Sequence, residues 1–234
     1  MTGNIQFGKA SFAYEVTHVA RKTLEIAVHP DRRVVVRAPL DAGCDDIKAR
    51  LKKRAGWVLR QIEYFRQFEP REPARSFVSG ETHRYLGRQY RLTVTKAKET
   101  QVRMNRGRIV VELAGAVSSS KVADCLEAWY RTRAREYFKE RLEYCAQVFA
   151  LKGRTLPRLQ IKKMCSRWGS LSPNATLTLN LALIKTPREC IDYVIMHELC
   201  HLKFDDHGLG FYKLLGKLMP DWEKRKRKLE LALV

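Results

Sequence analysis

Two histidines and a glutamate near the C-terminal end of the chain have the spacing of a metal site. His197 and His201 are four residues apart, so on one helix both imidazoles would project from the same face and reach a single ion. Glu198 follows the first histidine directly, where it could take a proton from a metal-bound water. His207 lies six residues further on and could complete a three-histidine set. The pattern predicts a zinc hydrolase.

The same pentapeptide would also occur in a surface helix with two exposed histidines and a salt-bridging glutamate. The flanking residues therefore have to distinguish a metal site from such a helix. Thr186 is placed to cap this helix, with Pro187 as its first residue and Glu189 completing a capping box. Asp192, Met196 and Lys203 would project from roughly the side opposite an apolar stripe made of Ile191, Ile195, Leu199 and Leu202. A capped, half-buried helix would hold the two histidine side chains rigidly, which favours the metal site over a surface helix.

Composition sets the class of protein. The 234 residues are 45% hydrophobic and 30% charged, which is enough for a core in one large domain or two closely packed ones. No stretch approaches the roughly 20 apolar residues of a membrane span, and the first residues do not resemble a signal peptide. The six cysteines include no Cys-x-x-Cys pair, so reduced thiols are expected; Cys200 would point away from the histidines. A cytoplasmic protein with no membrane contact is predicted.

The charge balance is a second signal. The chain carries 45 Lys and Arg against 25 Asp and Glu, a formal charge of +20. Such a field favours polyanions such as nucleic acid or nucleotides, although a solvated basic surface has the same composition. Basic residues gather in the segment Lys224–Lys228 and on a predicted helix near residue 50. The members on that helix are Lys48, Arg50, Lys52, Lys53, Arg54 and Arg60.

The rest of the chain predicts an α+β fold. We expect N-terminal β-hairpins over residues 11–40, a helix over 45–68 and a connector over 69–80. A second small β region follows to about 113, with a tight turn at Asn105-Arg106-Gly107, and then a long helix over 120–150. This organisation predicts a β-rich region over 1–118 and a zincin-like helical and β metallopeptidase core over 119–234, or one compact unit. His83 is expected to be an exposed polar residue without a functional role.

Residues 176–183 alternate between leucine and small or polar residues, which predicts a half-buried strand. As an edge strand beside the zinc helix, it could also pair with an extended peptide substrate through backbone hydrogen bonds. Three residues are candidates, by position only, to contact the substrate or stabilise an oxyanion: Arg167, Asn180 and Tyr212.

Several segments together resemble the YgjP-like metallopeptidase family of bacteria, which is related to SprT-like and WLM zinc proteases. The segments are Cys165–Ser170, the strand with Asn180, Ile191–Val194, the histidine motif, Pro220–Trp222, Ser79–Glu81 and Tyr85–Arg88. The resemblance implies a Zn²⁺ site of His197, His201 and His207 with Glu198 as base. The chain departs from the family pattern at Leu171, at Asp206 and Gly208, and at Phe211 with Tyr212. These departures concern substrate contacts, not the ligands.

The main functional hypothesis is therefore a zinc-dependent metallopeptidase, acting on peptides or on proteins associated with nucleic acid. A metal-dependent nucleotide phosphohydrolase would also suit the positive charge, although no phosphate-binding glycine loop or second-metal carboxylate cluster is apparent. A basic nucleic-acid-binding module with a vestigial zinc site is a third hypothesis, and the presence of Glu198 argues against it. The sequence leaves the oligomeric state open.

Overall fold

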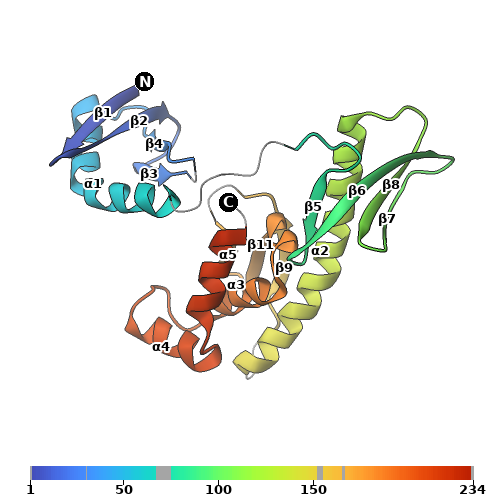
Figure 1. Ribbon diagram of the computed structural model, residues 1–234. Coiled ribbons are helices and arrows are strands. Elements are labelled where there is room, and N and C mark those ends of the chain that lie inside the picture. Colours follow the sequence, from blue (N-terminus) through green and yellow to red (C-terminus); the bar gives the residue numbers. More distant parts are fainter. Residues whose placement is uncertain (1, 30, 67–74, 152–154, 165–166, 233–234) are drawn as a thin grey trace. The chain divides into compact units, whose positions relative to one another are not determined.

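The computed structural model describes residues 2–29, 31–66, 75–151, 155–164 and 167–232 (Figure 1). In this part of the chain, three small sheets and five α-helices form an α+β fold, as predicted. Contacts divide the chain into two compact units, residues 1–72 and 73–233. The division differs from the boundary expected at 118/119, because the strands before residue 118 pack on the long helix that follows them. The predicted C-terminal end of the first helix (67–68) and the first half of the connector (69–74) lie outside the described residues.

The first unit is a four-stranded sheet covered by one helix. Strands β1 (Thr2–Phe7) and β2 (Ala10–His18) are antiparallel, β3 (Glu25–Val28) and β4 (Val34–Ala38) are antiparallel, and β2 runs parallel to β4. Helix α1 (Cys44–Arg66) buries Ile47, Leu51, Ala55 and Val58, at helical spacing, in the core of this unit. The side chains that α1 leaves exposed are mostly basic.

The second unit begins with a sheet of order β5-β6-β8-β7. Its strands are β5 (Thr82–Tyr85), β6 (Arg88–Ala97), β7 (Gln101–Asn105) and β8 (Arg108–Ala114). Arg106 and Gly107 both have positive φ, 42° and 77°, and form the two-residue turn of the β7–β8 hairpin, which confirms the turn expected there. Leu92, Ile109 and Val111 lie in the same buried core as the long helix that follows.

Helix α2 (Ser119–Phe149) is the longest element and supports the rest of this unit. The Ser118 side chain accepts a hydrogen bond from Lys121 N, and Ala150, at φ 54°, ends the helix in the left-handed conformation. Figure 1 shows the β5–β8 sheet along one part of α2 and the C-terminal elements along another. The helix is therefore the common wall between the sheet and the histidine motif.

A three-stranded sheet precedes the histidine helix, and here two expectations are wrong. Its order is β10 (Gly169–Leu171), β11 (Thr176–Asn180), β9 (Arg158–Lys162), so β11 is central and β10 is an edge. The predicted strand over 176–183 ends at Asn180, because the Asn180 side chain accepts from Ala182 N and begins a 3-10 helix, η1 (Leu181–Lys185). The sheet edge that lies beside α3 thus belongs to β10.

Helix α3 (Arg188–Cys200) carries His197 and Glu198 and lies between α2, α4 (Leu209–Leu218) and α5 (Trp222–Ala232). The predicted capping box does not form: Pro187 is the N-cap without a side-chain bond, and the Thr186 hydroxyl donates to Leu183 O instead. Met196 is buried and not on an open side as expected, because α3 is enclosed by its neighbours. None of the helices described here is long and apolar enough to cross a membrane.

One ion pair joins the two central helices. The Arg141 guanidinium on α2 donates to both carboxylate oxygens of Asp192 on α3, at 2.7 and 2.9 Å. Both side chains are largely buried, with exposed fractions of 19% and 14%. The pair therefore fixes the rotation of α3 against α2.

We expect Asp192→Asn to lower the free energy of unfolding of this unit by about 1–3 kcal/mol, because Arg141 would lose its counter-charge while staying largely buried. The control is Glu136→Gln, which breaks the more exposed ion pair between Arg133 and Glu136 and should change stability by less than about 1 kcal/mol. Urea unfolding measures both. Equal, small losses in the two variants would show that the buried pair does not hold α3.

Candidate metal centre

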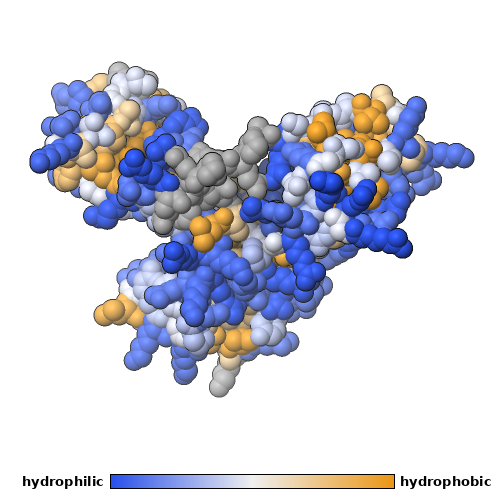
Figure 2. Space-filling view, in the orientation of Figure 1, coloured by the Kyte–Doolittle hydropathy of each residue, from blue (hydrophilic) through white to orange (hydrophobic). Residues whose placement is uncertain are grey.

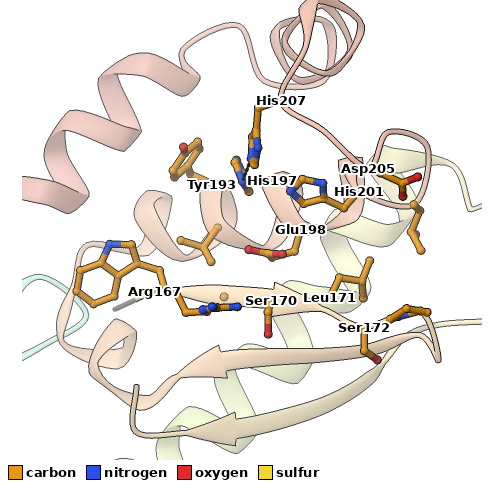
Figure 3. A pocket seen from close by; sticks show the side chains of 15 residues that line it. Arg167, Ser170, Leu171, Ser172, Tyr193, His197, Glu198, His201, Asp205 and His207 are labelled. Atoms are coloured by element: carbon orange, nitrogen blue, oxygen red, sulfur yellow. Dashed lines mark hydrogen bonds between the residues drawn. The ribbon is translucent and has the colours of Figure 1, made fainter. Parts of the chain in front are cut away.

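Three histidine side chains converge at the end of α3 (Figure 3). His197 lies in the last turn of the helix, His201 is its C-cap, and His207 comes from the loop before α4. Their ring centroids are 4.7 to 5.3 Å apart, and each offers a nitrogen within 4.8 Å of the others. The structure thus brings together the three residues that the spacing selected, and the cluster could hold a metal ion.

The ring of His201 is oriented by the turn that follows α3. His201 Nδ1 lies 2.9 Å from Phe204 O, so Nδ1 donates to this carbonyl and Nε2 is left for a ligand bond. The Phe204 ring occupies the space in which a Cβ on Gly210 would lie, only 2.6 Å from the ring. Phe204 stands at the position where the metzincin motif has a glycine, and its ring packs over Gly210 at the start of α4.

The environment keeps the imidazoles of His197 and His207 neutral. Burial, with the nearby His207 and His201 and Lys226, lowers the pKa of His197 to about 3. Burial also lowers the pKa of His207. His197 Nδ1 is buried without a hydrogen-bond partner among the described residues. Neutral imidazole is the form that binds a metal, so these two ligand candidates need not lose a proton at neutral pH.

The separation of two of the ring nitrogens is compatible with a tetrahedral metal ion such as zinc. Zn–N bonds of about 2.0–2.1 Å at a tetrahedral angle put two ligand nitrogens roughly 3.3 Å apart. The Nε2 atoms of His197 and His207 face each other at 2.9 Å, close to that separation. Phe211 packs against all three rings, with centroids 4.6 to 4.9 Å away, and limits their movement. Three imidazoles would leave a fourth position open.

Glu198 lies beside this cluster and faces the edge strand β10. Its side chain is buried, and this burial raises the pKa of its carboxyl to about 7, against the influence of His201, Leu171 and Arg167. A Cβ at Gly169 would come within 2.8 Å of Glu198 Oε1 and 3.0 Å of Val194 Cγ1. Gly169 thus provides the room that Glu198 occupies, while Leu171 supplies a backbone hydrogen bond to the carboxylate.

A cleft of about 780 Å³ runs over the cluster between β10 and α3. Arg167 lines it, as expected of a substrate-contacting residue, and Figure 3 shows this side chain on the β10 side of Glu198. Tyr193 also lines the cleft, one helical turn before His197. The spacing of Tyr193, His197 and His201, four residues apart in each case, could have identified Tyr193 from the sequence.

The other two candidate contacts lie elsewhere. Asn180 is buried, and its side-chain amide donates to Met164 O and Arg167 O, so it supports the segment that carries Arg167. Tyr212 stacks on Trp222 with centroids 5.2 Å apart and does not line the cleft. His83 is buried beside Glu81 and Phe77 and is not the surface residue expected. Cys200 is buried, as expected, whereas Cys165 lies outside the described residues.

Comparison with known proteins agrees with the resemblance. The model of the YgjP-like metallopeptidase domain matches residues 22–232, and the chain belongs to this family. It is therefore a metallohydrolase. Among solved structures, the metallopeptidase zymogen abylysin of Pyrococcus abyssi is 21% identical, with 39% of this chain and 90% of that chain covered and a TM-score of 0.36. The zymogen jannalysin of Methanocaldococcus jannaschii is 23% identical, with 42% and 90% covered and a TM-score of 0.37. No curated protein sequence matches.

We expect His207→Ala to weaken zinc binding by about 100-fold or more, because two imidazoles would remain where three converge. Competition with a chromophoric chelator measures the affinity without any substrate. His18→Ala, which removes an exposed histidine of the first unit, is the control and should bind zinc as the unaltered chain does. Unchanged affinity in His207→Ala would remove His207 from the ligand set.

Proposed function

We propose that this protein is a zinc-dependent metallopeptidase in which His197, His201 and His207 bind zinc and Glu198 is the general base. The observation that supports it best is the placement of the Glu198 carboxylate, enclosed between Gly169 and the histidine cluster at the bottom of an open cleft. Zinc, when bound, would lower the pKa of a water toward about 7 and polarise the scissile carbonyl.

Each residue of the site has a part in this proposal. Glu198 accepts a proton from the attacking water and passes it to the nitrogen of the leaving amine. The guanidinium of Arg167 lies close enough to influence the Glu198 carboxyl, and it is the candidate for holding substrate oxygen on that side. Tyr193 presents its ring beside His197 at 5.9 Å between centroids, and so bounds the cleft.

Strand β10 offers a backbone edge to an extended substrate. Trp168 O accepts from Asn180 N and Ser172 N donates to Thr176 O, so the even-numbered positions of this strand bond to β11. The backbone groups of Gly169 and Leu171 therefore point to the outer edge, where α3 lies. A peptide pairing with that edge would place its carbonyls near Glu198. The strand-addition hypothesis thus moves from β11 to β10.

Glu198→Gln should reduce kcat by about 10²–10⁴-fold, because the amide cannot accept the water proton, while zinc content stays at one ion per chain. Peptide hydrolysis and metal analysis on the same sample separate the two effects. Hydrolysis at the unaltered rate in Glu198→Gln would refute the proposed role of this residue.

The decrease of kcat/KM at low pH (its acid limb) should reflect protonation of the Glu198 carboxylate. Burial raises the pKa of its carboxyl to about 7, so the basic form is lost as the pH falls through that value; a bound cation would move the limb lower. Arg167 lowers this pKa, so Arg167→Gln should shift the limb to higher pH. A pH–rate profile measures the shift, and a limb that stays in place or moves to lower pH would contradict it.

We further propose that the substrates are proteins associated with nucleic acid. All six basic residues noted on α1 are exposed, and Figure 2 shows hydrophilic residues over α5, which carries Lys224–Lys228. The expected outcome is faster cleavage of a DNA-bound protein than of the same protein free, with the difference lost at high salt. Among the described residues no carboxylate joins the histidine cluster, which favours peptide over nucleotide hydrolysis.

A further inference from the structure

One carboxylate in the cleft has no partner among the residues described. Asp205 lines the cleft and is exposed, and its side chain makes no hydrogen bond or ion pair with any residue that the structure describes. Basic residues outnumber acidic ones 45 to 25, so acids in this chain have many possible partners. Asp31, Asp192 and Asp221, for example, are all paired with arginines. Asp205 is thus available to a ligand in the cleft.

The surroundings of Asp205 suit a long basic side chain. Leu171, Pro173 and Leu202 line the same cleft and provide apolar surface. Figure 3 shows Asp205 and Leu171 on the His201 side of the cluster. The side chains of Lys and Arg have an apolar stem that packs on such surface and a charged end that binds a carboxylate. An apolar wall with a single unpaired acid matches that chemistry.

The opposite end of the cleft has the opposite charge. Arg167 comes just before β10, whereas Ser172 and Pro173 come just after it. At about 3.3 Å per residue, the chain from Arg167 to Ser172 can span up to roughly 16 Å along the cleft. A peptide lying along β10 would therefore meet a cation on one side of the histidine cluster and an anion on the other, which makes the cleft selective for sequence and direction.

We propose that Asp205 selects substrates with a Lys or Arg side chain on the His201 side of the scissile bond. This inference rests on the proposed peptidase function and adds its substrate class. The overall positive charge would repel a basic peptide at long range, but such repulsion is screened over about 8 Å at physiological salt. The selection is made by contact within the cleft.

The test uses internally quenched peptides that are blocked at both ends. They carry Lys, norleucine or Glu at the substrate position that would lie on the His201 side of the scissile bond. We expect kcat/KM for Lys to exceed that for norleucine by about threefold to fivefold, the size of one exposed charge pair. Asp205→Asn should remove this preference, and Asp205→Lys should reverse it in favour of Glu. Asp206→Asn, at the neighbouring position outside the cleft lining, is the matched control and should keep the preference for Lys.

A second measurement separates this inference from the proposed function. Zinc-loaded Glu198→Gln protein should bind the Lys peptide more tightly than the norleucine peptide, and the added Asp205→Asn change should abolish the difference. Glu198-dependent cleavage without a Lys or Arg preference would overturn the role of Asp205 and leave the peptidase intact. No cleavage of any peptide would refute the peptidase, and equal binding of the two peptides would then refute Asp205 as well. Cleavage only of peptides with a free N-terminus would assign Asp205 to the α-amino group and also overturn the proposal.

Discussion

The enclosure of α3 is the constraint on which the site depends. The helix is buried by α2, α4, α5 and the strand β10, and only one end of it opens to the cleft. Burial holds His197 and Glu198 in fixed positions, and it also removes them from water. The same loss of solvent lowers the pKa of His197 and raises the pKa of Glu198, so one packing arrangement prepares both the proposed metal ligand and the proposed base.

The second element of the site is an edge strand that lacks a side chain where Glu198 needs space. Gly169 lets the carboxylate lie against β10, and Leu171 donates a backbone hydrogen bond to it. Asn180 on the central strand holds the segment that leads into β10 by bonding Met164 O and Arg167 O. The sheet thus forms one wall of the cleft, and among the described residues β10 pairs with a strand, β11, on one side only.

Local patterns predicted much of this arrangement. The four-residue spacing of His197 and His201 needs only helical geometry, and the Arg106-Gly107 turn needs only positive φ at two positions. The errors concern contacts between distant segments. Whether residues 176–180 form an edge depends on β9 and β10, and Asn180 points to the backbone of a segment 13 to 16 residues earlier. Gly169 was not identified because its neighbour, Glu198, is far along the chain.

The most direct test of the account is a crystal structure of the zinc-soaked protein with anomalous data collected on both sides of the zinc edge. The account predicts one ion about 2.0–2.1 Å from the Nε2 atom of each histidine in the cluster, with His201 Nδ1 still bonded to Phe204 O. It also predicts that Glu198 stays outside the ligand set. An ion held by Glu198, or by residues other than His197, His201 and His207, would contradict it.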